Sequence, residues 1–90
     1  MMYKFMTLDD GTEIVHSEYY ENGEVKVYVE TPDEDKGFLH MTVFLPSYRI
    51  EEIEGYNSEK VGHIMDVIRS TAHLIIEFSR NGGYENASGF

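Results

Sequence analysis

Residues 58–80 read SEKVGHIMDVIRSTAHLIIEFSR, and this stretch decides the fold. Its apolar residues recur at helical spacing and form one stripe, which comprises Val61, Ile64, Met65, Ile68, Ala72, Ile75 and Ile76. Either Asn57 or Ser58 can cap the start of a helix, and Asn81-Gly82-Gly83 is a strong stop after Arg80. The sequence therefore predicts one long amphipathic helix whose stripe covers a β-sheet. A second, shorter stripe predicts a further contact for the C-terminal half of this helix; it comprises Val67, Leu74 and Phe78.

Four segments rich in aromatic and β-branched residues precede this helix, with turn residues between them: 3–8, 13–20, 24–30 and 38–45. Because their connections are short, we predict an α+β fold, a four-stranded antiparallel meander with one long C-terminal helix packed on one face. Pro46 ends the fourth strand, and residues 49–53 form either a helical turn or a short edge strand. We expect residues 1–83 to be a single domain and residues 84–90 a flexible C-terminal tail.

The turns at 9–11 and 21–23 predict the register of the first two hairpins. A three-residue loop with its glycine in the left-handed conformation pairs Val15 with Val29 and turns both toward the helix. A two-residue loop would instead turn His16 toward the helix, which makes a poor core. The second face of the sheet then carries Met6, Ile14, His16, Glu18, Tyr20, Lys26, Tyr28, His40, Thr42 and Phe44.

This second face is a candidate interface, because it would be unusually aromatic and apolar if it were exposed. Its candidate contact residues are His16, Tyr20, Tyr28, His40 and Phe44. One helix leaves the other face of a sheet open, and a homodimer can close it. The alternative is a solvated face, since single exposed tyrosines and histidines are common.

Charge is the most pronounced feature of the composition. The chain has a formal net charge of −10, and fourteen of its seventeen acidic residues lie between Asp9 and Glu59. Direct binding of nucleic acid is not expected, because phosphate contacts need clustered Lys and Arg. The chain has no cysteine, no long apolar stretch and no apolar run of a signal peptide, which predicts a cytoplasmic protein that does not span a membrane.

Two acidic clusters lie in predicted connectors, where carboxylates can project freely toward a partner. They comprise Asp33, Glu34, Asp35, Glu51, Glu52 and Glu54. On the predicted helix, Glu59, His63 and Asp66 share one face, where a divalent metal could be held; a solvated face is the alternative. No serine has the context of an activated nucleophile and no glycine-rich phosphate loop precedes the helix, so neither an enzyme nor a cofactor is expected.

Three segments carry a resemblance: DGTEIVHS at 10–17, LPSY at 45–48 and AHLIIEFS at 72–79, the last followed by Gly82-Gly83. In these segments and their order the chain resembles, along nearly its whole length, small uncharacterised bacterial proteins. The resemblance implies a family but no activity and no catalytic residues.

The leading hypothesis is a non-enzymatic interaction protein whose acidic surface engages a basic partner, such as a nucleic-acid-handling protein. Antitoxins and anti-CRISPR-type inhibitors act in this way. The alternative functional class is a small metal- or ligand-binding domain that uses His63 and its neighbours, or His16 and His40 on the sheet. The alternative for the charge itself is that it only keeps the protein soluble.

Overall fold

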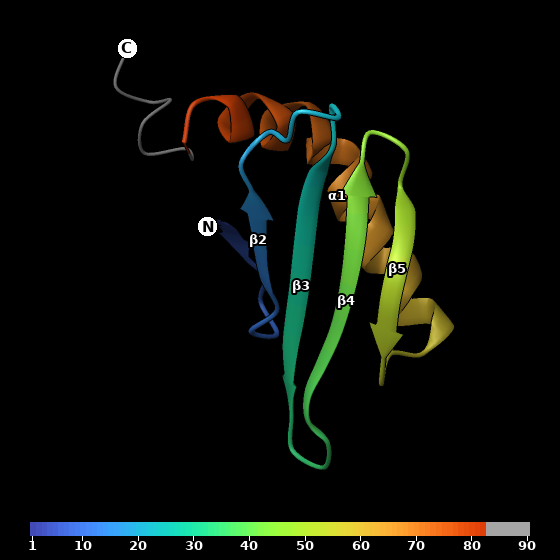
Figure 1. Cartoon of the computed structure of the whole chain (residues 1–90). Helices are drawn as coiled ribbons and strands as arrows, with labels where there is room; N and C mark the ends of the chain where they lie inside the picture. Colours follow the sequence, from blue (N-terminus) through green and yellow to red (C-terminus); the bar gives the residue numbers. More distant parts are fainter. Residues whose placement is uncertain (83–90) are drawn as a thin grey trace.

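The computed structural model describes residues 1–82, which form a five-stranded antiparallel sheet and one helix (Figure 1). The strands are β1 (Met2–Thr7), β2 (Glu13–Ser17), β3 (Val25–Asp33), β4 (Gly37–Leu45) and β5 (Arg49–Glu54), and the helix is α1 (Ser58–Arg80). Each strand pairs with the next in the chain, so the sheet is a meander. The predicted α+β class is confirmed, whereas the predicted number of four strands is wrong. The predicted tail, residues 84–90, lies outside the described residues.

The fifth strand comes from the segment whose sequence left two structures open. β5 pairs antiparallel with β4 from Glu54 opposite His40 to Arg49 opposite Phe44, with a register shift between Thr42 and Val43. Charged residues fill most of β5, so its own sequence shows no alternation typical of a strand. Pairing with β4 therefore decides its conformation.

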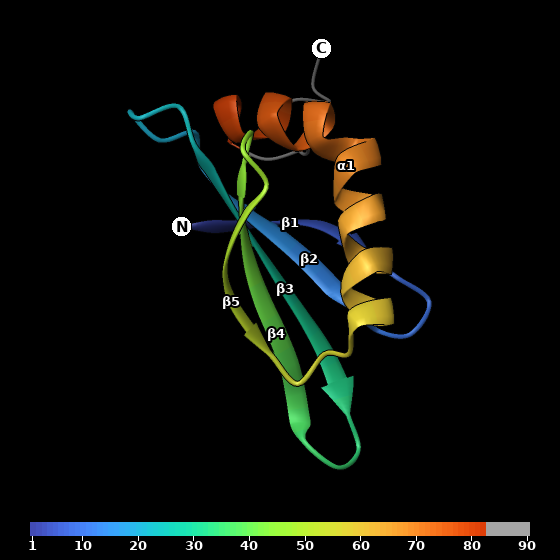
Figure 2. The same cartoon turned by 90° about the vertical axis from the view of Figure 1, so that its right-hand side faces the viewer.

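Helix α1 covers one face of the sheet, and no element of residues 1–82 covers the other (Figure 2). Ile64, Ile68 and Ile75 of the predicted stripe are fully buried. They meet a layer of fully buried aliphatic residues on the sheet, which comprises Ile14, Val25, Val27, Val29, Met41, Val43 and Leu45. Asn57 is the N-cap, because its side chain accepts the N–H of Lys60 at 2.8 Å.

The shorter helical stripe also finds its contacts inside the chain. The ring of Phe78 lies 6.0 Å from that of Phe5 in β1, and Val67 packs against the core. Among the described residues, the open face of the sheet is therefore a larger uncovered surface than the shorter stripe of α1.

The glycine turns form as predicted, but the ladders beyond them do not keep the predicted register. Gly11 and Gly23 have φ values of 87° and 83°, and both loops contain three residues, since Leu8 N–H donates to Thr12 O and Tyr20 N–H to Glu24 O. Beyond the second loop, however, the ladder pairs His16 with Val27.

A slip of one residue between Ser17 and Tyr19 accounts for this change. Ser17 Oγ accepts the N–H of Lys26 at 2.9 Å, where a ladder would use a main-chain carbonyl. Tyr19 leaves the ladder altogether and donates its N–H to Ser79 O of α1 at 3.1 Å. β2 consequently ends at Ser17 rather than at Tyr20.

The slip exchanges the two faces of β2. Ile14 and His16 are fully buried under α1, although the sequence placed both on the second face. Val15, predicted to face the helix, pairs with Tyr28 on the open face. In β1 a second register shift lies between Lys4 and Met6, and Lys4 pairs with Val15.

A chain of hydroxyl groups joins the first turn to the segment that leads into α1. Thr12 Oγ1 lies 2.6 Å from Thr31 Oγ1, which lies 2.8 Å from the hydroxyl of Tyr56. That hydroxyl donates to Leu39 O at 3.2 Å, because a carbonyl only accepts. Since each hydroxyl has one proton, Thr31 donates to Tyr56 and Thr12 donates to Thr31. This series of hydrogen bonds thus gives the hydroxyl groups of two buried threonines, Thr12 and Thr31, hydrogen-bond partners.

Candidate partner-binding surface

The register of β3, β4 and β5 arranges the open face in cross-strand rows. The first row contains Lys26, Phe44 and Arg49, and the second contains Tyr28, Thr42 and Glu52. The third row contains Glu30, His40 and Glu54, and it extends to Glu13 on β2. Side chains of cross-strand partners are immediate neighbours. The open face therefore changes from cationic to acidic along the strands.

In the acidic row, polar contacts hold the side chains in place. His40 Nε2 lies 3.0 Å from Glu54 Oε2, and the hydroxyl of Tyr28 donates to Glu30 Oε2 at 3.1 Å. The rings of Tyr28 and His40 stack with centroids 6.2 Å apart. Burial, followed by the hydrogen bond to Glu30, raises the pKa of Tyr28. The phenol thus stays protonated and keeps donating to this carboxylate.

At the opposite end, Arg49 covers the aromatic ring of Phe44. Its guanidinium carbon lies 4.4 Å from the ring centroid. The same guanidinium binds Glu24 Oε2 at 2.9 Å and also pairs with Glu51. The hydrogen bond between Arg49 and Glu24 lowers the pKa of Glu24, and the same bond raises the pKa of Arg49. The ring of Phe44 is therefore partly covered by the Arg49 guanidinium and does not form an uncovered apolar surface.

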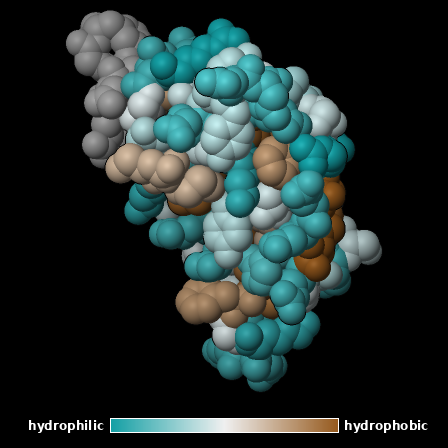
Figure 3. All heavy atoms as spheres, in the orientation of Figure 1, coloured by the Kyte–Doolittle hydropathy of each residue, from teal (hydrophilic) through white to brown (hydrophobic). Residues whose placement is uncertain are grey.

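The predicted interface residues thus separate into three places. Tyr28, His40 and Phe44 share the open face and are each half-buried. His16 lies in the core beneath α1, and Tyr20 lies in the turn after β2. Figure 3 looks onto the open face and shows hydrophobic atoms interspersed with hydrophilic ones, so no continuous apolar patch covers it.

The hairpin between β3 and β4 carries the first acidic cluster, in a tighter turn than the sequence predicted. Strand pairing continues to Asp33 opposite Gly37, so the predicted connector is mostly strand. Asp33 Oδ1 accepts the N–H groups of Asp35 and Lys36 at 2.9 and 3.0 Å, and these bonds lower the pKa of Asp33. Asp33, the last residue of β3, therefore caps the turn with its side chain, while Glu34 and Asp35 are exposed.

The second acidic cluster lies in β5, and the pairing of Glu54 with His40 of β4 places it toward the same end of the sheet. Lys36 Nζ at the hairpin tip donates to Gly55 O, just after β5, at 3.2 Å. In Figure 1 the arrow of β5 points toward the same end of the sheet as the β3–β4 hairpin, whose tip extends beyond the end of β5. We call this group the acidic end; it comprises Glu30, Asp33, Glu34, Asp35, Glu52 and Glu54.

Sequence reasoning found the two clusters but missed Glu30. Its membership depends on its pairing with His40, so only the β3–β4 register could have indicated it. Glu51, which the sequence did name, is instead held by Arg49.

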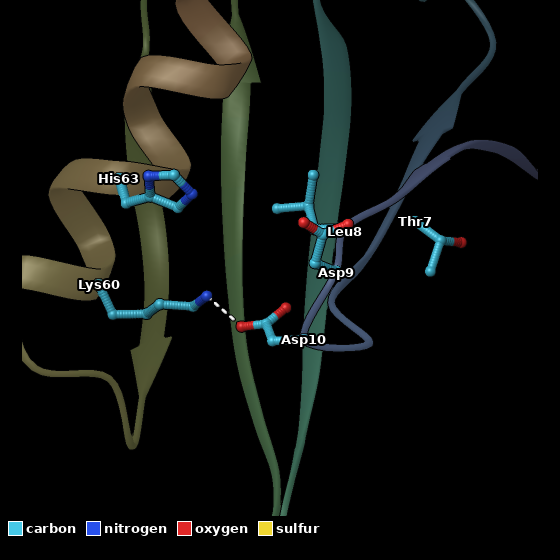
Figure 4. A pocket seen from close by; sticks show the side chains of 6 residues that line it. All are labelled: Thr7, Leu8, Asp9, Asp10, Lys60 and His63. Atoms are coloured by element: carbon cyan, nitrogen blue, oxygen red, sulfur yellow. Dashed lines mark hydrogen bonds and ion pairs between the residues drawn. The ribbon is translucent and has the colours of Figure 1, made fainter.

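A pocket of about 340 Å³ lies between the first turns of α1 and the loop after β1 (Figure 4). Lys60 of α1 reaches across it and pairs with Asp10, which also accepts the N–H of Thr12 at 3.0 Å. The Lys60 bond, with help from Thr12, holds the pKa of Asp10 far below its ordinary range. His63 lines this pocket as well. The pocket is therefore closed across one side by an ion pair that fastens α1 to the first turn.

The alternative metal site does not assemble. Glu59, His63 and Asp66 are all exposed, and Asp66 lies 3.5 Å from Arg69. Within residues 1–82, no group of three or more histidine or acidic side chains is placed to hold a metal ion.

Comparison of this chain with protein-family models, curated proteins and solved structures gives no match. No helix within residues 1–82 has the length and apolar character needed to cross a membrane.

Proposed function

We propose that this chain is a non-enzymatic interaction protein whose acidic end binds a basic surface of a partner protein. The observation that carries the proposal is the pairing of β3, β4 and β5, which brings two acidic clusters toward one end of the sheet, where Lys36 Nζ also donates to Gly55 O. Charges gathered in this way raise the local concentration of a cationic partner and accelerate its association.

The neighbouring cations do not cancel this charge. Arg49 is already engaged by Glu24 and Glu51, and Lys26 lies in the row at the opposite end of the open face. Between Glu30 and Glu54 the chain has seven acidic residues and two basic ones. A duplex or single-stranded nucleic acid is repelled by this surface.

A partner that holds nucleic acid presents the clustered lysine and arginine that the acidic end complements. Binding there would place this chain where the phosphates otherwise lie. The proposed role is therefore that of an inhibitor or antitoxin of a basic, nucleic-acid-handling protein, acting by competition for its cationic surface.

The test compares two charge reversals of equal size. The site variant carries Glu34→Lys, Asp35→Lys and Glu52→Lys; Asp33 is left intact because it caps its turn. The control variant carries Glu18→Lys, Glu21→Lys and Glu77→Lys, which are all exposed and lie outside the acidic end. The probe is an octalysine peptide, and its association rate is measured by stopped-flow fluorescence across a salt series.

We expect the site variant to associate more slowly than the control variant, although both have the same net charge. For the wild type the rate should fall steeply as salt rises, because exposed charges are screened over about 8 Å at physiological ionic strength. Equal slowing in the two variants would show that only total charge matters and would refute the proposed site. A short DNA duplex should not bind any of the three proteins.

A further inference from the structure

Strand β5 forms one edge of the sheet. All six of its residues are exposed, and among residues 1–82 its only neighbouring strand is β4. An edge strand presents unpaired main-chain N–H and C=O groups along its free side, which is a template for another strand. Such edges bind extended peptides through main-chain hydrogen bonds, with side chains giving specificity.

The side chains of β5 are divided between the two faces of the sheet. Ile53 pairs with Met41 and Ile50 with Val43, and both partners belong to the buried core layer. The two isoleucines are three residues apart, so a regular strand would turn them to opposite faces. The register shift between Thr42 and Val43 places both on the helix-covered side.

The fold buries neither isoleucine side chain completely. Ile50 is 38% exposed and Ile53 is 46% exposed, at the margin where the core layer stops. Figure 3 shows strongly hydrophobic atoms along this margin of the molecule, on the side of β5. A further strand alongside β5 would extend the core layer over them.

On the open face, β5 presents carboxylates instead. Glu52 pairs with Thr42, and Glu54 pairs with His40. Residues of an added strand that lie beside these two glutamates would gain from positive charge. A strand that alternates basic and aliphatic residues therefore matches both faces of β5 at once.

A second copy of this chain matches less well than a basic segment. Antiparallel pairing of two β5 strands would bring together six glutamates and only two arginines, and like charges in cross-strand positions are destabilising. The opposite edge of the sheet, β1, is also less suitable, because it carries Lys4, which would repel a basic segment.

We infer that β5 binds an extended segment of the partner as a sixth strand, with basic residues over Glu52 and Glu54 and aliphatic residues against Ile50 and Ile53. This inference rests on the proposed function and gives its binding mode. The acidic end attracts the partner, and the free edge of β5 fixes its orientation.

The experiment uses two peptides with identical composition and charge. The first is the all-L peptide Lys-Val-Lys-Val-Lys-Val-Lys with capped termini, and the second has the same order with alternating L and D residues, which cannot form a regular strand. Affinity is measured by fluorescence anisotropy, and amide hydrogen exchange of the full chain is followed by NMR with and without each peptide.

We expect the all-L peptide to bind about tenfold or more tightly than the L/D peptide, a difference that the strand-specific hydrogen bonds supply. It should slow amide exchange within β5, and Ile53→Gln should weaken its binding. The matched control is Phe38→Gln, which alters an exposed apolar residue outside β5 whose exposure is 59%, against 46% for Ile53. Melting temperatures of both variants verify that they fold.

The two proposals fail in different ways. Equal affinity for both peptides, or protection of β1 instead of β5, overturns strand addition but leaves charge recognition at the acidic end intact. Absence of binding by either peptide at low salt overturns both proposals. Amide exchange measured on the wild type shows whether the peptide binds along β5, even if Ile53→Gln does not fold.

Discussion

His16 is a histidine enclosed by aromatic rings, and its protonation should limit stability at acidic pH. It is fully buried, with the rings of Tyr3 and Phe5 5.6 and 6.3 Å away. Nδ1 lies 2.8 Å from Ser17 O, a carbonyl that only accepts, so Nδ1 carries the proton of the neutral ring. Nε2 has no hydrogen-bond partner within the described chain. Burial lowers the pKa of His16 below its ordinary value of 6.5.

The sign of the effect follows from proton binding. As pH falls through 6.5, the unfolded chain binds a proton at His16 more readily than the folded chain does. Its contribution to stability is therefore complete above pH 6.5, and the free energy of unfolding falls below it by up to roughly 1.4 kcal/mol per pH unit. Urea titrations at pH 7.5 and 5.5 should show this loss for the wild type. His16→Phe should remove most of it, whereas the exposed His73→Gln should not.

At the same scale, the hydroxyl chain of Thr12, Thr31 and Tyr56 should behave as a unit. Tyr56→Phe removes the donor to Leu39 O and the acceptor for Thr31, at a cost of about 1–2 kcal/mol. Thr31→Val removes two bonds and leaves the Thr12 proton without this acceptor, so it should cost more. Because the bonds share partners, the double variant should cost less than the sum of the single ones. Strict additivity in urea denaturation would contradict this network.

At the scale of elements, the packing of α1 on the sheet should determine whether the domain folds. Ile68 is fully buried in the centre of the helical stripe. Ile68→Asp places an unpaired carboxylate there and should unfold the protein, while Ile68→Ala should cost about 2–5 kcal/mol. The control is Asp66→Ala on the exposed side of α1. Circular dichroism melts measure all three, and an unchanged melt of Ile68→Asp would refute the packing described above.

The elements also show what local sequence can predict. The bounds of α1 agree with the predicted ones because its cap, its stripe and its stop all lie within or next to the helix. β5 lacked such signals, since its conformation depends on pairing with β4. The register of β2 is accompanied by a hydrogen bond from Tyr19 N–H to Ser79 O, a long-range contact that no turn rule contains. For the same reason, the acidic clusters were predictable from composition, whereas Glu30 and the true place of His16 were not.

For the whole molecule, the open face remains a predicted site of homodimerisation that sedimentation can test. A dimer through this face would place Tyr28 and Phe44 at its centre, so Tyr28→Glu and Phe44→Glu should each give a folded monomer. Analytical ultracentrifugation over a wide concentration range measures the outcome. A wild-type monomer at the highest concentration would leave the face to a different partner. Dimers that persist in both variants would place the contact elsewhere.

The bond between Tyr19 N–H and Ser79 O has a consequence for synthesis on the ribosome. The turn at 21–23 alone favours the register in which Ser17 and Val15 face inward, whereas the folded chain holds Tyr19 out of the ladder and against the end of α1. A nascent chain that stops short of Ser79 lacks the carbonyl that accepts this N–H. The last helical turn to be translated therefore supplies one contact of the final alignment of the second strand.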